Sequence, residues 1–193
     1  MEPKLAVPGA GLPKLELLIA RLIFALRRLT GSRNSFDALI RNERELICDL
    51  VQACDSASAN RRILIKRLPG LEDSSRYWSV WMTLDHLRIV NLELGRVIGT
   101  LTKGVIPEGE ASTAFVKPRN DLNADVVTAF EESLNVLIET VAAAPKLDTA
   151  VRYSHPWFGP LNAAGWHALA GVHMGIHRLQ IERILEGLSR VKE

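Results

Sequence analysis

The residues best suited to chemistry are two histidines near the C-terminus, in the segment HMGIHRLQ at 173–180. On a helix, a spacing of four places His173 and His177 about 40° apart and roughly 6 Å apart along the axis, so both rings can reach one ion. Gln180 extends this face by one turn. Burying such groups without partners costs about 1–3 kcal/mol each, so the pattern predicts a metal site. The alternatives are a solvated face or histidines hydrogen-bonded inside the core.

A third candidate ligand lies far upstream in the sequence. His86 shares a helical stripe with Val90, Glu93 and Val97, and this stripe is apolar enough to predict that His86 faces inward. Three neutral imidazoles suit a divalent transition metal such as zinc, nickel, cobalt or iron, and they leave positions open for water or substrate. We therefore expect His86, His173 and His177 to bind one such ion.

Glu93 is a candidate partner for this site because it follows His86 by seven residues, which places it two turns away on nearly the same face. There it would serve as a base or as a hydrogen-bond acceptor for a ligand. An exposed surface glutamate is the alternative interpretation.

A loop of unusual composition, SHPWFGP at 154–160, directly precedes the histidine helix. Its prolines and glycine restrict the backbone, while Trp157 and Phe158 supply apolar surface beside His155. The loop is expected to form either one wall of a pocket or a structural corner. His167 lies about 120° from His173 around the helix, which predicts an exposed or more distant residue.

The elements that must position these residues are helices, because the apolar residues between the prolines recur at helical spacing. We expect an all-α four-helix bundle with an additional N-terminal helix, in a single domain over 13–193 that follows a flexible leader at 1–12. Ser79 and Asn162 are suitable N-caps. The connection at 103–121 is long enough for two consecutive helices to run parallel. The helices are expected at 13–30, 35–68 with a kink at 55–60, 79–103, 123–143 and from 162 onward.

The first helix is apolar over most of its circumference. Its polar residues Lys14, Arg21 and Arg28 are seven apart and form one narrow stripe. Such a helix needs burial on more than one side, which favours docking across the main body or a dimer interface. A helix lying on a membrane surface is the alternative.

Composition excludes several classes of protein. Lys+Arg 24 against Asp+Glu 22 leaves a net charge of +2, which is too balanced to indicate nucleic-acid binding. The most apolar stretch, residues 15–26, is too short and too charged to span a bilayer, so no transmembrane segment is expected. No cleavage site follows this stretch, and a cytoplasmic location is the resulting expectation.

These motifs resemble the DinB/YfiT-like family of metal-dependent helical bundles over most of the chain. In that family a tryptophan-serine pair opens the second core helix, a histidine follows a few residues later, and the last helix carries H-x-x-x-H-R-x-Q. The segment HPWFG at 155–159 resembles the loop of one branch. The matching residues here are Trp78, Ser79, His86, His173, His177, Arg178 and Gln180, with Trp166 after the loop.

The resemblance implies an up-down-down-up bundle, three histidine ligands and frequent homodimers. It also implies that some members carry out metal-dependent transfer or isomerisation with a low-molecular-weight thiol. The helix at 13–30 lies outside the usual four-helix unit, and no further residue matches a substrate motif.

Two functions are therefore predicted. The first is a metalloenzyme, a thiol transferase or isomerase or a hydrolase, in which the ion lowers the pKa of a bound water or thiol. The second is a non-catalytic helical dimer or adaptor module whose histidine site is structural or empty. A water-accessible cavity at the histidines favours the enzyme, whereas four protein ligands favour a structural site.

Overall fold

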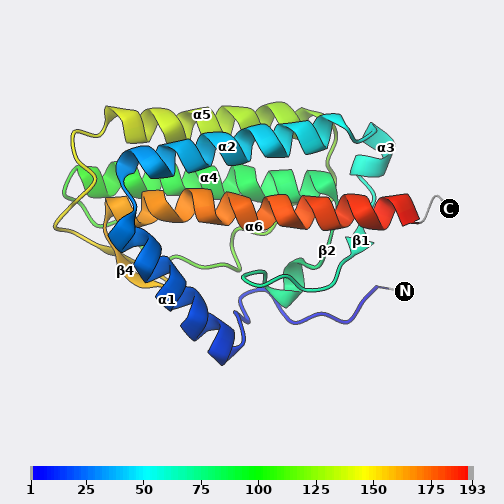
Figure 1. The fold of residues 1–193 in the computed structure, drawn as a ribbon, viewed down its shortest axis with the longest axis horizontal. Helices are drawn as coiled ribbons and strands as arrows, with labels where there is room; N and C mark the ends of the chain where they lie inside the picture. The colour runs from blue at the N-terminus through cyan, green and yellow to red at the C-terminus, as the bar shows by residue number, and fades with distance from the viewer. Residues whose placement is uncertain (1, 191–193) are drawn as a thin grey trace.

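The computed structural model describes residues 2–190, and four long helices within this range lie side by side (Figure 1). They are α2 (Arg33–Gln52), α4 (Val80–Thr102), α5 (Asp125–Ala143) and α6 (Ala163–Arg190). Helix α4 packs on α5 and α6, and α2 packs on α6. The colour gradient shows that α4 and α5 run in one direction and α2 and α6 in the other. The four-helix bundle predicted from the hydrophobic periodicity is confirmed.

The core is built from the apolar stripes that the sequence pattern predicts. Leu84, Leu87 and Ile98 of α4 are fully buried, and they pack in one cluster with Phe130 and Leu134 of α5. Hydrophobic residues three or four apart lie on one face of a helix, so each helix buries a continuous stripe. Polar side chains interrupt this core on α4 and α6, where His86, His177 and Gln180 are also buried.

Both predicted caps fix the starts of the helices that carry the histidines. The Ser79 hydroxyl accepts a hydrogen bond from the Met82 N–H at 3.1 Å, and Asn162 Oδ1 accepts one from the Gly165 N–H at 2.9 Å. Each cap satisfies a backbone N–H that has no partner within its own helix. The starting point of a helix sets which residues face inward, so these caps help to orient the site.

The expected helix up to residue 68 is wrong. After α2 the chain forms a single turn, α3 (Ser56–Ala59), and then an extended segment in which β1 (Ile63–Leu64) pairs antiparallel with β2 (Tyr77–Trp78). A 3-10 turn, η1 (Asp73–Ser75), lies between them. The strand passes so close to α6 that a Cβ on Gly187 would lie 2.5 Å from Ile63 Cγ2. Ile63, a β-branched residue in an extended segment, fits against Gly187 at this distance, whereas a helix would be too wide for the same space.

A second hairpin lies within the proline-rich loop before α6. Strand β3 (Tyr153–His155) pairs antiparallel with β4 (Gly159–Leu161), and His155 is opposite Gly159. The turn depends on Gly159, whose φ of +69° is unfavourable for residues with a side chain. The hairpin lies at one end of the bundle, beside the start of α6 (Figure 1).

Helix α1 (Lys14–Thr30) slants away from the bundle as an arm (Figure 1). Phe24 is its one buried residue in the described chain. The prediction that the apolar face of α1 docks across the main body is therefore wrong. The prediction that this face forms a dimer interface is not tested by the fold. Seven large aliphatic side chains are 48–83% exposed, namely Leu15, Leu18, Ile19, Leu22, Ile23, Leu26 and Leu29. Among residues 2–190, no helix combines the length and apolarity that crossing a bilayer requires.

Residues 2–13, the described part of the chain before α1, contain no helix or strand, yet they make specific contacts. The Ala6 N–H donates to Asp73 at 2.8 Å, and the Gly9 N–H donates to Glu72 at 3.3 Å. Leu12 is buried next to the bundle. These contacts link the N-terminal segment to the loop between β1 and β2.

Close packing of α2 on α6 should make Gly171 intolerant of a side chain. A Cβ at this position would lie 2.8 Å from two atoms of Leu39, whereas a Cβ on Gly95 would make only ordinary contacts, the nearest at 3.7 Å. Since alanine favours a helix over glycine by about 1 kcal/mol, we expect Gly95→Ala to be neutral or stabilising. Gly171→Ala should instead lower the free energy of unfolding by about 1–3 kcal/mol, as measured by urea denaturation. Equal stabilities of the two variants would contradict this packing.

Candidate metal centre

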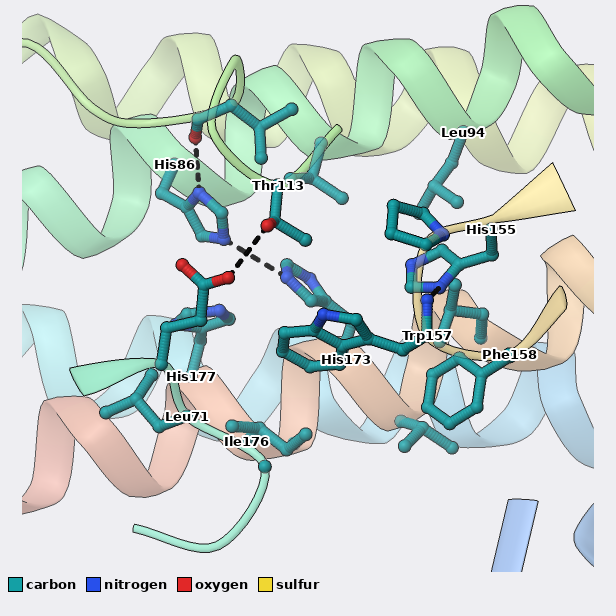
Figure 2. Close-up of a pocket in the computed structure, with 18 of the residues that line it drawn as sticks. Leu71, His86, Leu94, Thr113, His155, Trp157, Phe158, His173, Ile176 and His177 are labelled. Atoms are coloured by element: carbon teal, nitrogen blue, oxygen red, sulfur yellow. Dashed lines mark hydrogen bonds between the residues drawn. The ribbon is translucent and has the colours of Figure 1, made fainter. Parts of the chain in front are cut away.

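Three histidines from two helices converge inside the bundle (Figure 2). One ring nitrogen each from His86 on α4 and from His173 and His177 on α6 lies within 4.8 Å of the others. The Nε2 atoms of His86 and His173 are 3.1 Å apart, and the ring centroids are separated by 4.4–5.0 Å. The three predicted residues are thus close together and could hold a metal ion.

Hydrogen bonds fix the protonation of two of the three rings. The Val116 carbonyl, which can only accept, lies 2.6 Å from His86 Nδ1, so Nδ1 carries the proton of the neutral ring. His177 Nδ1 lies 2.7 Å from Gln180 Oε1, and the Gln180 amide is oriented because its Nε2 donates to the Ser75 carbonyl at 2.7 Å. In both rings Nε2 is left with a lone pair, which is the form that binds a metal.

His173 completes the set and leaves one polar atom unsatisfied. Its Nδ1 is buried and has no hydrogen-bond partner within the described chain. Its Nε2 faces the lone pair on His86 Nε2, and two lone pairs at 3.1 Å repel unless a proton or a cation lies between them. Three nitrogen donors gathered around one point fit a divalent transition metal.

Burial keeps all three rings neutral. Burial is the largest effect and holds the pKa of His86, His173 and His177 well below 6.5, and the neighbouring histidines lower the pKa further. The ammonium group of Lys117 lowers the pKa of His86 and His177 in the same direction. Metals bind unprotonated imidazole, so near pH 7 the site is ready to bind without losing protons.

Trp78 closes one side of the cluster. Its ring stacks on His177 at a centroid distance of 6.1 Å and lies 5.1 Å from the ring of His86. Lys117 Nζ lies 5.6 Å above the centroid of the same indole. Trp78 therefore limits the freedom of both rings and lies close enough to report on an ion bound between them.

The cluster also borders a cavity of about 1010 Å³ that reaches the hairpin β3–β4 (Figure 2). His155, Trp157 and Phe158 line this cavity, as the pocket-wall interpretation of the loop expects. The Trp157 N–H donates to His155 Nδ1 at 3.1 Å, so Nε2 carries the proton in the neutral ring. Burial lowers the pKa of His155 to about 4.

Two other residues considered from the sequence lie away from the three ligands. Glu93 lines the cavity, but its carboxylate binds Arg96 at 2.5–2.8 Å and its side chain is 40% exposed. His167 is 1% exposed, so of the two alternatives predicted for it, an exposed residue or one more distant from the ion, the first is wrong. Its Nε2 lies 3.0 Å from Asp37 on α2, because its side of α6 packs against that helix.

A buried charged cluster beside the histidines was not predicted from the sequence. Glu72 accepts hydrogen bonds from Thr113 and Lys117, both at 2.7 Å, and all three residues line the cavity. Burial alone would raise the pKa of Glu72, but the hydrogen bonds from Lys117 and Thr113 outweigh it and lower the pKa. These residues lie in segments without helical periodicity, so no pattern in the sequence indicates that they meet.

No described protein family matches this sequence, and no curated protein does. A solved structure does match. The fold is similar to that of TT2238, a four-helix bundle protein, with a TM-score of 0.58 over 78% of this chain and 98% of that one. The two sequences are 18% identical, so the similarity concerns the fold alone.

The lowered pKa of His155 predicts a pH-dependent stability. In the folded chain the pKa is about 4, against 6.5 for a free histidine, so between these values only the unfolded chain takes up the proton. The free energy of unfolding should therefore fall as the pH drops from 6.5 toward 4, by up to about 1.4 kcal/mol per pH unit from this residue.

His155→Gln should show a shallower decline in urea denaturation series at pH 7, 6 and 5. The difference between the two proteins isolates His155 from the other buried histidines, which are present in both. Parallel curves for the wild type and the variant would show that His155 titrates normally in the folded chain.

Proposed function

We propose that this protein is a metal-dependent enzyme of the DinB/YfiT-like type, in which His86, His173 and His177 hold one divalent transition metal such as zinc, nickel or iron. The observation that carries the proposal is the convergence of three neutral imidazoles on one point at the wall of a large cavity. Three protein ligands beside a cavity are typical of a catalytic site, whereas structural sites are closed by four.

Neighbouring residues of the protein orient the three histidine ligands and exclude water from part of the site. Val116 and Gln180 hold the Nδ1–H groups of His86 and His177, which keeps each Nε2 available. Trp78 and the buried walls exclude water from one side, which strengthens electrostatic interactions inside. A bound metal supplies Lewis-acid chemistry there, including a lowered pKa for a water or thiol ligand.

Two kinds of reaction are consistent with such a centre: hydrolysis, and transfer or isomerisation with a small thiol. Glu72 is a poor proton acceptor for either reaction, because Lys117, Thr113 and two further donors already occupy its oxygens. The dependence of the rate on added thiol separates the two reactions, since hydrolysis has no such requirement.

Metal binding is tested by titrating metal-free protein with Co²⁺ and Zn²⁺ while following tryptophan fluorescence and calorimetry. We expect one equivalent to bind, with quenching by Co²⁺ through Trp78, which contacts two of the ligands. His173→Ala should weaken binding by about 100-fold or more, since even loss of a group that only supports a ligand costs 10–100-fold.

His167→Ala is the matched control, because His167 is a buried histidine of the same helix that lies outside the cluster. It should bind metal as the wild type does. Absence of stoichiometric binding to the wild type, or equal losses in the two variants, would rule out the proposed centre.

A second candidate function, association into a homodimer or with an adaptor partner, is favoured by α1. Its seven exposed aliphatic side chains present on the order of 700 Å², which exceeds the patch expected on a monomer and approaches the 800 Å² per partner of a stable interface. A two-fold axis at Leu22 would bring two copies of the same face together in antiparallel orientation. This role is compatible with catalysis.

Light scattering during gel filtration tests the dimer. We expect the wild type to elute at twice the chain mass of 21.4 kDa and Leu22→Asp to elute as a monomer, because a buried carboxylate without a partner destabilises the interface. Val136→Asp, at an exposed aliphatic residue of α5, should remain dimeric. A monomeric wild type at about 50 μM would rule out the homodimer, since stable interfaces of this area are dimeric well below that concentration.

A further inference from the structure

The cavity beside the histidines is walled mainly by apolar side chains from four parts of the chain. Ala20 and Ile23 of α1 form one side, Ile176 of α6 and Leu94 of α4 contribute others, and Trp157 lies at the hairpin end. Figure 2 shows these walls extending from the three histidines to Trp157 and Phe158. The volume of about 1010 Å³ is at the upper end for small-molecule sites.

The ionisable side chains around this cavity carry no net charge, because five acids and five Lys or Arg residues line it and the histidines are neutral. Four of the five cations are held in ion pairs: Arg88 with Asp85, Arg96 with Glu93, Lys117 with Glu72, and Arg178 with Glu43. Within the described chain, Arg27 alone among the lining cations has no ion-pair partner.

This charge balance restricts the ligand. A nucleotide or a thiol with two carboxylates requires several uncommitted donors or cations, since each buried anionic group without a partner is strongly disfavoured. Among the lining cations of the described chain only Arg27 is left without an ion-pair partner, and the Nε2–H of His155 is a neutral donor. The apolar walls of the cavity, in contrast, gain free energy from every methylene that leaves water.

We propose that the cavity binds a substrate with a long apolar body, such as an acyl or alkyl chain, and a single polar head group carrying at most one negative charge. The placement of the head group at the histidines rests on the proposed metal-dependent function. The binding of the apolar body does not, because its walls lie outside the three ligands.

The test uses 1-hexanol and 1-decanol as uncharged probes and follows their binding by calorimetry and tryptophan fluorescence in metal-free and zinc-loaded protein. Each buried methylene contributes about three- to fourfold in affinity, so we expect 1-decanol to bind at least about tenfold more tightly than 1-hexanol. Reduced glutathione and ATP should bind more weakly than 1-decanol to the metal-free protein. Equal affinity for the two alcohols, or tighter binding of either anion, would overturn the proposal.

Two pairs of variants test whether 1-decanol binds inside the cavity. Ala20 lines it and Ala25 lies on the exposed side of the same helix, so Ala20→Trp should weaken 1-decanol binding at least about fivefold and Ala25→Trp should not. Ile23→Lys and Val136→Lys form a second pair, both at exposed aliphatic residues of which only Ile23 lines the cavity, and Val136 lies on α5, away from α1. Equal losses within each pair would show that the alcohol does not bind in the cavity and would refute the assignment.

The outcomes for the cavity and the metal are independent. Tight binding of 1-decanol by a chain that binds no metal would support the apolar substrate site and reject the metalloenzyme. Stoichiometric metal binding by a protein whose affinity for alcohols does not depend on their chain length would support the metal centre and reject the apolar substrate site. Circular dichroism of each variant confirms that a loss of binding is not a loss of folding.

Discussion

The structure depends on one constraint: three imidazole rings are buried in the core of a helical bundle, and each ring nitrogen there needs a partner. The Nδ1–H groups of His86 and His177 donate to the Val116 carbonyl and to Gln180 Oε1. Of the four remaining nitrogens, three, one from each ring, lie within 4.8 Å of one another, and His173 Nδ1 has no hydrogen-bond partner within the described chain. Such a group is costly in a dry interior unless something binds between its members. The surrounding chain is arranged to hold the rings in this orientation.

The topology of the bundle supplies part of that arrangement. Because α4 and α5 run in the same direction, the chain must return along the bundle between them, and it does so through residues 103–124. This return segment passes over α4, where it provides the Val116 carbonyl to His86 and the Lys117 ammonium to Glu72. A tight hairpin between antiparallel helices would have offered neither group. The long connection is thus a part of the site.

Much of the fold was predictable because burial imposes a period on the sequence. The apolar stripes, the caps at Ser79 and Asn162 and the inward orientation of His86 all follow from residue type and helical spacing. The segment at 61–78 was not predictable in this way, because its extended course is set by packing of Ile63 against Gly187, 124 residues away in the chain. The hydrogen bond between His86 and the Val116 carbonyl could not be predicted either, because every residue has a backbone carbonyl and no sequence pattern marks which one is used.

Helix α1 is attached to the rest of the molecule at both ends of the cavity. Arg21 Nε donates to the Trp157 carbonyl at 2.5 Å, and Glu16 binds Arg67 and the Gly70 N–H. Its inner residues form a wall of the cavity while its outer residues face solvent. Any partner that binds the outer side of α1 would therefore also affect the position of this wall, so association through α1 and the shape of the cavity beside the histidines would be coupled.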